Sequence, residues 1–211
     1  MAPTRRRRMP AAQRREVILV AAEETFARSG YHGASLDDIA QAAGVSKALI
    51  YEHFESKREL HGSLLDAQAA EIFRRLEAAA ARGETGEERL RNGIDAFLRF
   101  VEERRDAWRM LFRDPTDPES AAVLDRMVGQ VTAEVTVLIS QDPGARGLTR
   151  VDADRSLRLL AEMLVGAAQS MANLWTDHPE TPRAELVAIA MDFAWLGLER
   201  LSRGERWSAP E

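Results

Sequence analysis

The stretch that decides the fold is SLDDIAQAAGVSKALIYEHFESKREL, residues 35–60. After Ser35, apolar residues recur every three or four positions, which is typical of a helix with one buried face. Gly44 and Ser46 interrupt this pattern and predict a turn followed by the capped start of a new helix. The stretch therefore predicts two short helices, each capped by a serine, with a third, longer helix beginning after Ser56. We read Ser35 with Asp38 as an approximate capping box and Ser56 with Glu59 as a full one.

Lys47 and Lys57 are the only lysines of a chain that has 29 basic residues, and both fall in this stretch. Each follows a serine that is predicted to cap a helix. Ammonium groups at the starts of two successive helices can hold a phosphate backbone on either side, and Tyr51 and His53 can donate hydrogen bonds to phosphate. The pattern favours a surface for a polyanionic partner.

The rest of the chain also reads as helix. Ile18, Ala22 and Phe26 recur every fourth residue before Gly30, which predicts a helix that ends there. Further helical patterns cover about 57–82, 87–105, 107–113, 118–140, 152–176 and 182–203, with turns or loops at 83–86, 114–118 and 142–150. No strand pattern occurs, so the sequence predicts an all-α protein.

Composition sets the broad class. Apolar residues make up 45% of the 211 residues and charged residues 30%, as in soluble globular proteins. No apolar run reaches the ~20 residues that span a bilayer, and no secretory signal precedes the first helix. The absence of cysteine excludes a disulfide framework and a thiolate metal site, and fits a cytoplasmic location. The first 57 residues carry a net charge of +2 and the remainder −7, which suggests a local contact with a polyanion.

Two short helices joined by a glycine-containing turn, after a supporting helix, form a helix-turn-helix. Over residues 13–60 the sequence resembles the DNA-binding domain of TetR-family transcriptional regulators. The resemblance rests on Ile18 to Phe26, on Gly30 and on the quoted stretch, above all Ala43-Gly44-Val45-Ser46, Tyr51, His53-Phe54 and Ser56-Lys57. Beyond residue 60 it is architectural only.

The resemblance implies an N-terminal three-helix DNA-binding domain, followed by a C-terminal helical bundle that binds an effector and forms a homodimer. We expect an Arg-rich disordered arm at 1–12, the helix-turn-helix domain at 13–57, the effector and dimerisation domain at 58–205, and a tail at 206–211. The implied function is transcriptional regulation, most simply repression, with release from a palindromic DNA operator when a small-molecule effector binds. Neither a cofactor nor a metal is expected, and no contact with a membrane.

The residues that match DNA contacts of the family are Ser35, Ser46, Lys47, Ala48, Leu49, Tyr51, His53 and Lys57. Ala48 and Leu49 depart from a common pattern of glycine and a polar residue, so Leu49 is expected to touch thymine methyl groups. Each contact has a structural alternative. Lys57 can be a plain surface charge, Tyr51 and His53 can pack inside the domain, and Leu49 can pack sideways. Arg5 to Arg8 can lie in a minor groove or can be a solvated tail.

In the C-terminal half, two strongly apolar helices are predicted to form a dimer interface, an internal core, or both. Gly166 and Gly197 inside them suggest close helix approach, because glycine lowers helix stability by about 1 kcal/mol relative to alanine. The candidate interface residues are Leu164, Ala168, Ile189 and Phe193. The candidate effector pocket, with a plain core as the alternative, comprises Phe97, Phe100, Trp108, Phe112, Met127, Met171 and Trp175.

Two other functions fit the sequence less well. An enzyme is disfavoured, because His32, His53, His61 and His178 show no metal-binding spacing and no phosphate loop or nucleophile elbow occurs. An interaction module without DNA binding is disfavoured by Lys47, Lys57, Tyr51 and His53. The sequence leaves open the effector, the operator, the regulated genes, and the choice between repression and activation.

Overall fold

The computed structural model describes residues 10–109, 118–140 and 153–203, apart from the side chains of a few residues within these ranges. In the described residues the chain is helical and has no strand. The helices are α1 (Ala11–Gly33), α2 (Leu36–Ala43), α3 (Lys47–Tyr51), α4 (Lys57–Ala80), α5 (Gly86–Glu103), α6 (Arg105–Trp108), α7 (Pro118–Ser140), α8 (Ala153–Asp177) and α9 (Arg183–Ser202). The predicted all-α class is confirmed.

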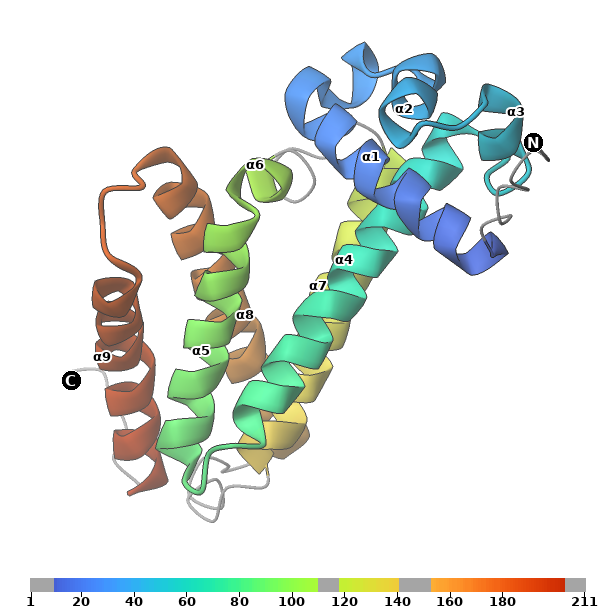
Figure 1. Cartoon of the computed structure of the whole chain (residues 1–211). Helices are drawn as coiled ribbons and strands as arrows, with labels where there is room; N and C mark the ends of the chain where they lie inside the picture. Colours follow the sequence, from blue (N-terminus) through green and yellow to red (C-terminus); the bar gives the residue numbers. More distant parts are fainter. Residues whose placement is uncertain (1–9, 110–117, 141–152, 204–211) are drawn as a thin grey trace, which may run out of the picture.

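Helices α1, α2 and α3 form a small N-terminal domain at one end of the molecule, with the first turns of α4 packed against them (Figure 1). Ser35 begins α2 with a complete capping box, in which its hydroxyl accepts from Asp38 N and the Asp38 carboxylate accepts from Ser35 N. Gly44 ends α2 in the left-handed conformation (φ 64°), which a residue with a side chain rarely adopts. Ile50 and Phe54 are buried in this core.

Three local expectations were wrong. Helix α3, which the sequence predicts to run to about Phe54, ends at Tyr51, and the backbone N–H groups of His53 and Phe54 both donate to Ile50 O. Ser56 forms half a capping box: its hydroxyl accepts from Glu59 N, but the Glu59 carboxylate accepts from Glu55 N rather than from Ser56 N. The helical run of α1 continues past Gly30, which kinks it with a φ of 68°, as far as Gly33.

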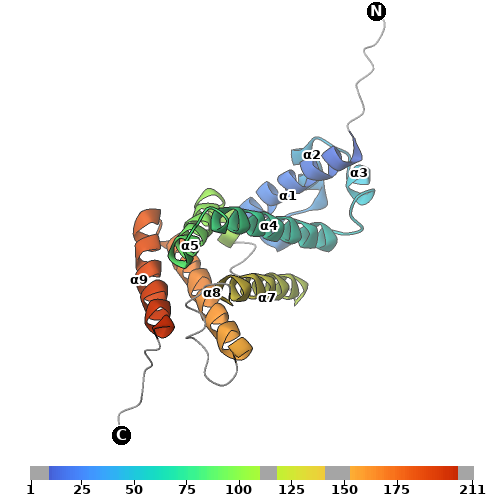
Figure 2. The same ribbon diagram turned by 90° about the horizontal axis from the view of Figure 1, so that it is seen from below.

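The C-terminal part is a helical bundle in which α5 lies between α4 and α9 (Figures 1 and 2). Helix α4 packs on α5 and α7, while α8 packs on α7 and α5. Helix α9 lies on the outer side of α5, held there by Arg183, whose guanidinium pairs with Asp95 (2.9 Å) and Glu102 of α5. The ribbon views show α9 well apart from α4 and α7 (Figure 2).

One core connects the two parts. Buried side chains run without a break from α1 through α4 to α5, α6 and α8, for example Phe26, Leu64, Ile72, Phe100 and Trp175. The first turns of α4 thus belong to the core of the N-terminal domain, whereas the predicted boundary falls at residue 57. That boundary assigns all of α4 after Lys57 to the C-terminal domain.

Several expectations lie outside the described residues. They concern Arg5 to Arg8, Phe112, the turn at 114–118, the loop at 142–150 and the tail at 206–211. The predicted helix at 107–113 is described only in its first part, where α6 begins earlier, at Arg105. Within the described ranges, no helix has the length and apolar character to cross a membrane.

Candidate nucleic-acid interface and ligand cavity

Helix α3 presents an exposed face at the surface of the N-terminal domain. Lys47, Ala48 and Tyr51 are exposed, while Ile50 faces the core. Ser46 caps the helix, and its hydroxyl accepts from Leu49 N at 3.2 Å, so the hydroxyl keeps its own proton to donate. A short helix with small and polar residues outward and one apolar side inward fits the recognition element of a helix-turn-helix.

Lys47 is at the start of this face but is paired within the chain. Its Nζ lies 2.8 Å from Asp37 Oδ2 in α2, and both side chains are exposed. The hydrogen bond and the charge of Asp37 raise the pKa of Lys47, so the ammonium stays charged. A phosphate would compete with Asp37 for the same ammonium group, and such an exposed pair contributes little to stability.

Lys57, at the start of α4, has a different environment. Its Nζ donates to two backbone carbonyls near the end of α1, Tyr31 O (2.8 Å) and Ala34 O (3.0 Å). The ammonium also lies 4.6 Å from the centre of the Tyr31 ring. In this structure Lys57 therefore joins α4 to α1, a structural role that the sequence did not reveal.

The other residues predicted to contact DNA differ in how exposed their side chains are. Tyr51 is 51% exposed and free to meet a partner. Leu49 and His53 are half-buried, and the His53 ring lies 6.4 Å from that of Phe54. His53 Nε2 is buried and has no hydrogen-bond partner. Ser35 is half-buried and engaged in its capping box. Lys47, Ala48 and Tyr51 thus share one accessible surface.

A large apolar cavity lies in the C-terminal bundle. It has a volume of about 690 Å³ and is lined by residues of α4, α5, α6, α7, α8 and α9. This is within the usual range for small-molecule sites. Along α5 the lining runs from Gly86 to Leu98, which corresponds to roughly 18 Å at 1.5 Å per residue. Arg89 and Glu199 are the charged residues among the described lining, so the cavity suits an elongated apolar ligand.

The predicted pocket residues divide into two groups. Phe97, Trp108, Met127 and Met171 line the cavity. Phe100 and Trp175 are buried but are not among the lining residues. The four candidate interface residues, Leu164, Ala168, Ile189 and Phe193, line it as well, and sequence reasoning did not foresee this overlap.

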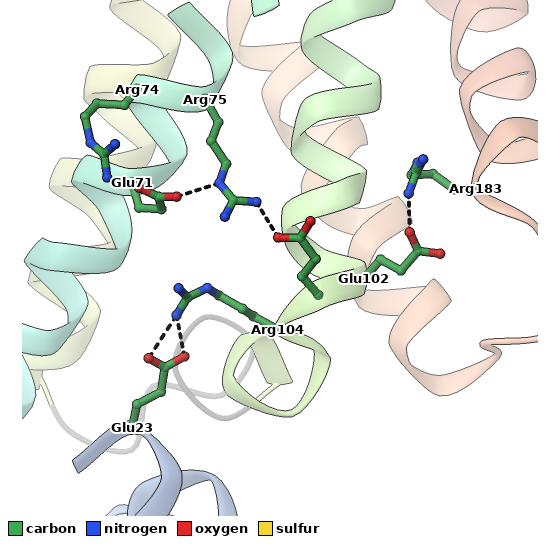
Figure 3. A network of polar contacts seen from close by, with 8 residues as sticks. Glu23, Glu71, Arg74, Arg75, Glu102, Arg104 and Arg183 are labelled. Carbon is green, nitrogen blue, oxygen red and sulfur yellow. Dashed lines mark hydrogen bonds and ion pairs between the residues drawn. The ribbon is translucent and has the colours of Figure 1, made fainter. Parts of the chain in front are cut away.

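Polar contacts connect the cavity wall to the N-terminal domain, and Figure 3 shows the pair of Arg104 and Glu23 among them. Arg104, which follows α5, donates to both carboxylate oxygens of Glu23 in α1, at 2.7 and 2.9 Å. Gln68 of α4 donates to the same carboxylate at 2.8 Å. On the cavity side, Trp108 N donates to Arg104 O at 2.7 Å, and Trp108 Nε1 donates to Asn173 Oδ1 at 3.0 Å. Side chains of α1, of α4 and of the residue after α5 thus meet at the half-buried carboxylate of Glu23, and Arg104 links this carboxylate to Trp108 in the cavity wall.

Comparison with known proteins agrees with this architecture. Residues 18–64 match the family model for bacterial regulatory proteins of the tetR family. Residues 87–197 match the model for a tetracyclin repressor-like C-terminal domain. The second match covers more than half of the chain, and together the two include the exposed face of α3 and most of the residues that line the cavity.

Individual relatives span most of the chain. The transcriptional activator FasR of Mycolicibacterium smegmatis is 32% identical over 197 residues, which cover 92% of this chain and 87% of FasR. A TetR-like regulator from Rhodococcus sp. RHA1 superposes with a TM-score of 0.73 at 26% identity, over 91% of this chain and 99% of its own. FadR of Bacillus subtilis, solved in complex with stearoyl-CoA, has a TM-score of 0.71 at 21% identity, over 90% and 99%. By both family models and by its likeness to FasR, the chain belongs to the TetR family of transcriptional regulators.

Proposed function

We propose that the protein is a homodimeric repressor that binds a near-palindromic operator and is released by a small-molecule effector with an elongated apolar group. The single observation that carries this proposal is the position of α4. The helix begins at Lys57 beside α3, and its later residues Ile72, Leu76 and Ala80 line the cavity. One continuous helix therefore contacts both candidate sites, which a coupling mechanism physically requires.

The DNA contacts are Lys47 and Tyr51 on the exposed face of α3, with Leu49 toward thymine methyl groups and Ser46 toward phosphate. His53, Ser35 and Lys57 flank this face. Lys57 reaches a phosphate only at the expense of its bonds to Tyr31 O and Ala34 O. A two-fold dimer presents two such faces about one DNA turn apart, which is why we expect a near-palindrome.

The effector class follows from the cavity lining. Its walls are apolar over roughly 18 Å of α5, so an aliphatic chain would bury most of its surface there. FadR of Bacillus subtilis holds stearoyl-CoA in the same fold. At 21% identity that likeness concerns the fold alone, so the proposal for this chain rests on its own lining residues.

Activation is the second candidate, because FasR, with 32% identity over nearly the whole chain, is a transcriptional activator. A promoter reporter distinguishes the two. An operator that overlaps the promoter, with expression rising when the gene is deleted, supports repression. Expression that falls on deletion supports activation.

The test of the proposed function has two steps. Selection from random duplexes with the purified protein should yield a near-palindrome whose half-sites are about one turn apart. A thermal-shift screen with long-chain carboxylic acids, their CoA thioesters and a drug panel should then find a ligand that changes operator affinity. If selection enriches no DNA sequence, the proposed DNA binding fails. If only ligands without a long apolar group stabilise the protein, the proposed effector class fails.

A further inference from the structure

One residue of the described cavity wall, Gln169 of α8, carries a side-chain amide. Apart from two tryptophans, Gln169 and Ser170 are the uncharged hydrogen-bonding side chains among the described lining residues. Ser170 is exposed, whereas Gln169 is half-buried. Within the described part of the chain, no hydrogen bond joins the Gln169 side chain to another residue. Its amide, which has two donor hydrogens and an acceptor oxygen, is therefore available to a ligand.

Asn173, one turn further along α8, shows on which side of the helix this amide lies. Asn173 Oδ1 accepts from Trp108 Nε1 at 3.0 Å. Trp108 lines the cavity, and its ring lies edge-on to that of Phe97 at 5.4 Å. Gln169 precedes Asn173 by one helical turn, and residues four apart lie on the same side of a helix. Gln169 is therefore on the Trp108 side of α8, about 6 Å along the helix from the level of Asn173.

The charged residues of the described lining lie together at the opposite end of the cavity. Arg183, at the start of α9, pairs with Asp95 and Glu102 in the second half of α5. The two helices therefore run in opposite directions, as Figure 1 shows. The first turn of α5, which contains Arg89, is thus at the same end as the last turn of α9, which contains Glu199. This end is away from Trp108 and from the N-terminal domain.

The cation at this charged end can hold a carboxylate. The guanidinium of Arg89 makes a long contact of 3.5 Å with Gly83 O, which an anion would readily replace with a stronger, charge-assisted hydrogen bond. Phe97, whose ring meets that of Trp108, lies further along α5 by roughly 12 Å at 1.5 Å per residue. An acid with its carboxylate at Arg89 and its chain extended to Phe97 therefore passes Gln169 about halfway.

We propose that Gln169 makes this cavity selective for long-chain acids that carry a hydroxyl group partway along the chain, and that its amide hydrogen-bonds that hydroxyl. A plain methylene chain would displace water from the amide and leave it unpaired, whereas a hydroxyl can both donate to the amide oxygen and accept from its nitrogen. The inference rests on the proposed function, because it concerns the ligand of the same cavity.

The experiment measures how well four acids of equal chain length displace cis-parinaric acid, a fluorescent long-chain fatty acid, from the full-length protein. The acids are stearic acid and its 2-hydroxy, 7-hydroxy and 12-hydroxy derivatives. The 7-hydroxy acid should bind tightest, about fivefold more tightly than stearic acid, as expected for one net hydrogen bond. The 2-hydroxy acid should gain nothing, because its hydroxyl stays beside the carboxylate at the charged end. This series needs no variant protein.

Substitution of Gln169 should reverse the order of affinities. Gln169→Leu and Gln169→Met remove the amide but keep a side chain of similar size that favours a helix. Both variants should bind stearic acid more tightly than the wild type does, and both should bind the 7-hydroxy acid more weakly than stearic acid, because the buried hydroxyl then lacks a partner. Gln130→Leu is the matched control, since Gln130 is an exposed glutamine of α7 outside the lining, and it should keep the wild-type order.

The outcomes separate this inference from the proposed function. If the wild type binds neither internal hydroxy acid more tightly than stearic acid, the inference is overturned, while an elongated apolar effector stands. A preference for an internal hydroxyl that persists in both Gln169 variants overturns it as well, because another group must then bind the hydroxyl. If neither cis-parinaric acid nor any of the four acids binds, the proposed effector class fails and the inference fails with it.

Discussion

Lys47 and Lys57 look alike in the sequence, because each follows a serine that caps a helix, but their ammonium groups have different partners. Lys47 pairs with the exposed carboxylate of Asp37, and Lys57 donates to two backbone carbonyls of the α1 end. Sequence spacing places both at helix starts. It does not reveal which ammonium group the folded chain already uses, because Tyr31 and Ala34 approach Lys57 only through the packing of α1 on α4.

Because the two ammonium groups have different partners, we expect substitutions of Lys47 and Lys57 to differ in their effect on protein stability. Lys47→Ala should weaken binding to every duplex and reduce the slope of log affinity against log salt by about one, with an unchanged melting temperature. Lys57→Ala should lower the melting temperature as well, since two carbonyls lose their donor. Asp37→Asn, which frees Lys47, should strengthen duplex binding at low salt. Fluorescence anisotropy at several salt concentrations measures duplex binding, and thermal denaturation measures the melting temperatures. A full salt slope in Lys47→Ala would exclude Lys47 as a phosphate contact.

Asp38 offers a test of the capping box by pH. Hydrogen bonds from the Ser35 hydroxyl and from its backbone N–H lower the pKa of the Asp38 carboxyl. A lowered pKa stabilises the fold above the unfolded pKa of about 3.9, and this contribution disappears as the pH falls through the folded value. Ser35→Ala should raise the pKa of Asp38 toward its ordinary value and make the acid limb of stability shallower. NMR titration of the Asp38 carboxyl carbon measures this, and an unchanged pKa in the variant would contradict it.

At the scale of elements, helix starts were predicted better than helix ends. A helix start can be predicted from a few neighbouring residues, because a capping side chain accepts a hydrogen bond from a backbone N–H two or three positions on, as at Ser35, Ser46 and Ser56. Phe54, just after the end of α3, is buried in the core, and Tyr31, next to the kink at Gly30, packs against Phe26. These are tertiary effects that no local pattern shows.

The lining of the cavity also could not be predicted from local sequence alone. Phe97 and Phe100 are three residues apart on α5, and the sequence predicts both as pocket residues. Phe97 lines the cavity. Phe100 is not among the lining residues and lies against the guanidinium groups of Arg75 and Arg104. Which face of α5 meets the cavity depends on the placement of α9, which Arg183 fixes through Asp95 and Glu102. Those contacts join residues more than 80 positions apart.

Among the contacts between helices, we expect the Glu23–Arg104 pair to contribute most to joining α1 to α5. The Glu23 side chain is 17% exposed and that of Arg104 33%, and one guanidinium nitrogen, Arg104 Nη1, donates to both carboxylate oxygens. A double-mutant cycle with Glu23→Gln and Arg104→Gln should give a coupling energy of about 1–2 kcal/mol, above the ~0.2–1 kcal/mol of exposed pairs. Urea unfolding measures it. The control is the exposed pair of Arg158 and Glu162 within α8, which should give a coupling energy of no more than about 0.5 kcal/mol.

If that cycle gives a coupling no larger than the control, the pair contributes little to joining α1 to α5. Effector signals would then depend on α4 alone. A coupling of the expected size gives the ligand a second route, from Trp108 through Arg104 to Glu23, because Trp108 both lines the cavity and donates to the backbone of Arg104.

At the scale of the whole molecule, both routes act on the orientation of the N-terminal domain. Helix α4 has 24 residues and is roughly 36 Å long, so a small tilt at Ile72 and Leu76 is amplified at Lys57. In a dimer, two recognition helices that no longer match successive grooves cannot bind together, and much of the affinity is lost. The expected coupling is about 1–3 kcal/mol.

Spin labels can measure this tilt directly, because the chain has no cysteine and each introduced one is unique. In Val20→Cys the label is on an exposed position of α1, away from the face of α3. The distance between the two labels of a dimer should change when an effector found by the thermal-shift screen binds. A label at Val137→Cys on α7 is the control: it should move less, since α7 packs within the C-terminal bundle. Equal shifts at both positions would indicate rotation of whole subunits, and unchanged distances with DNA release still occurring would indicate coupling through altered dynamics instead.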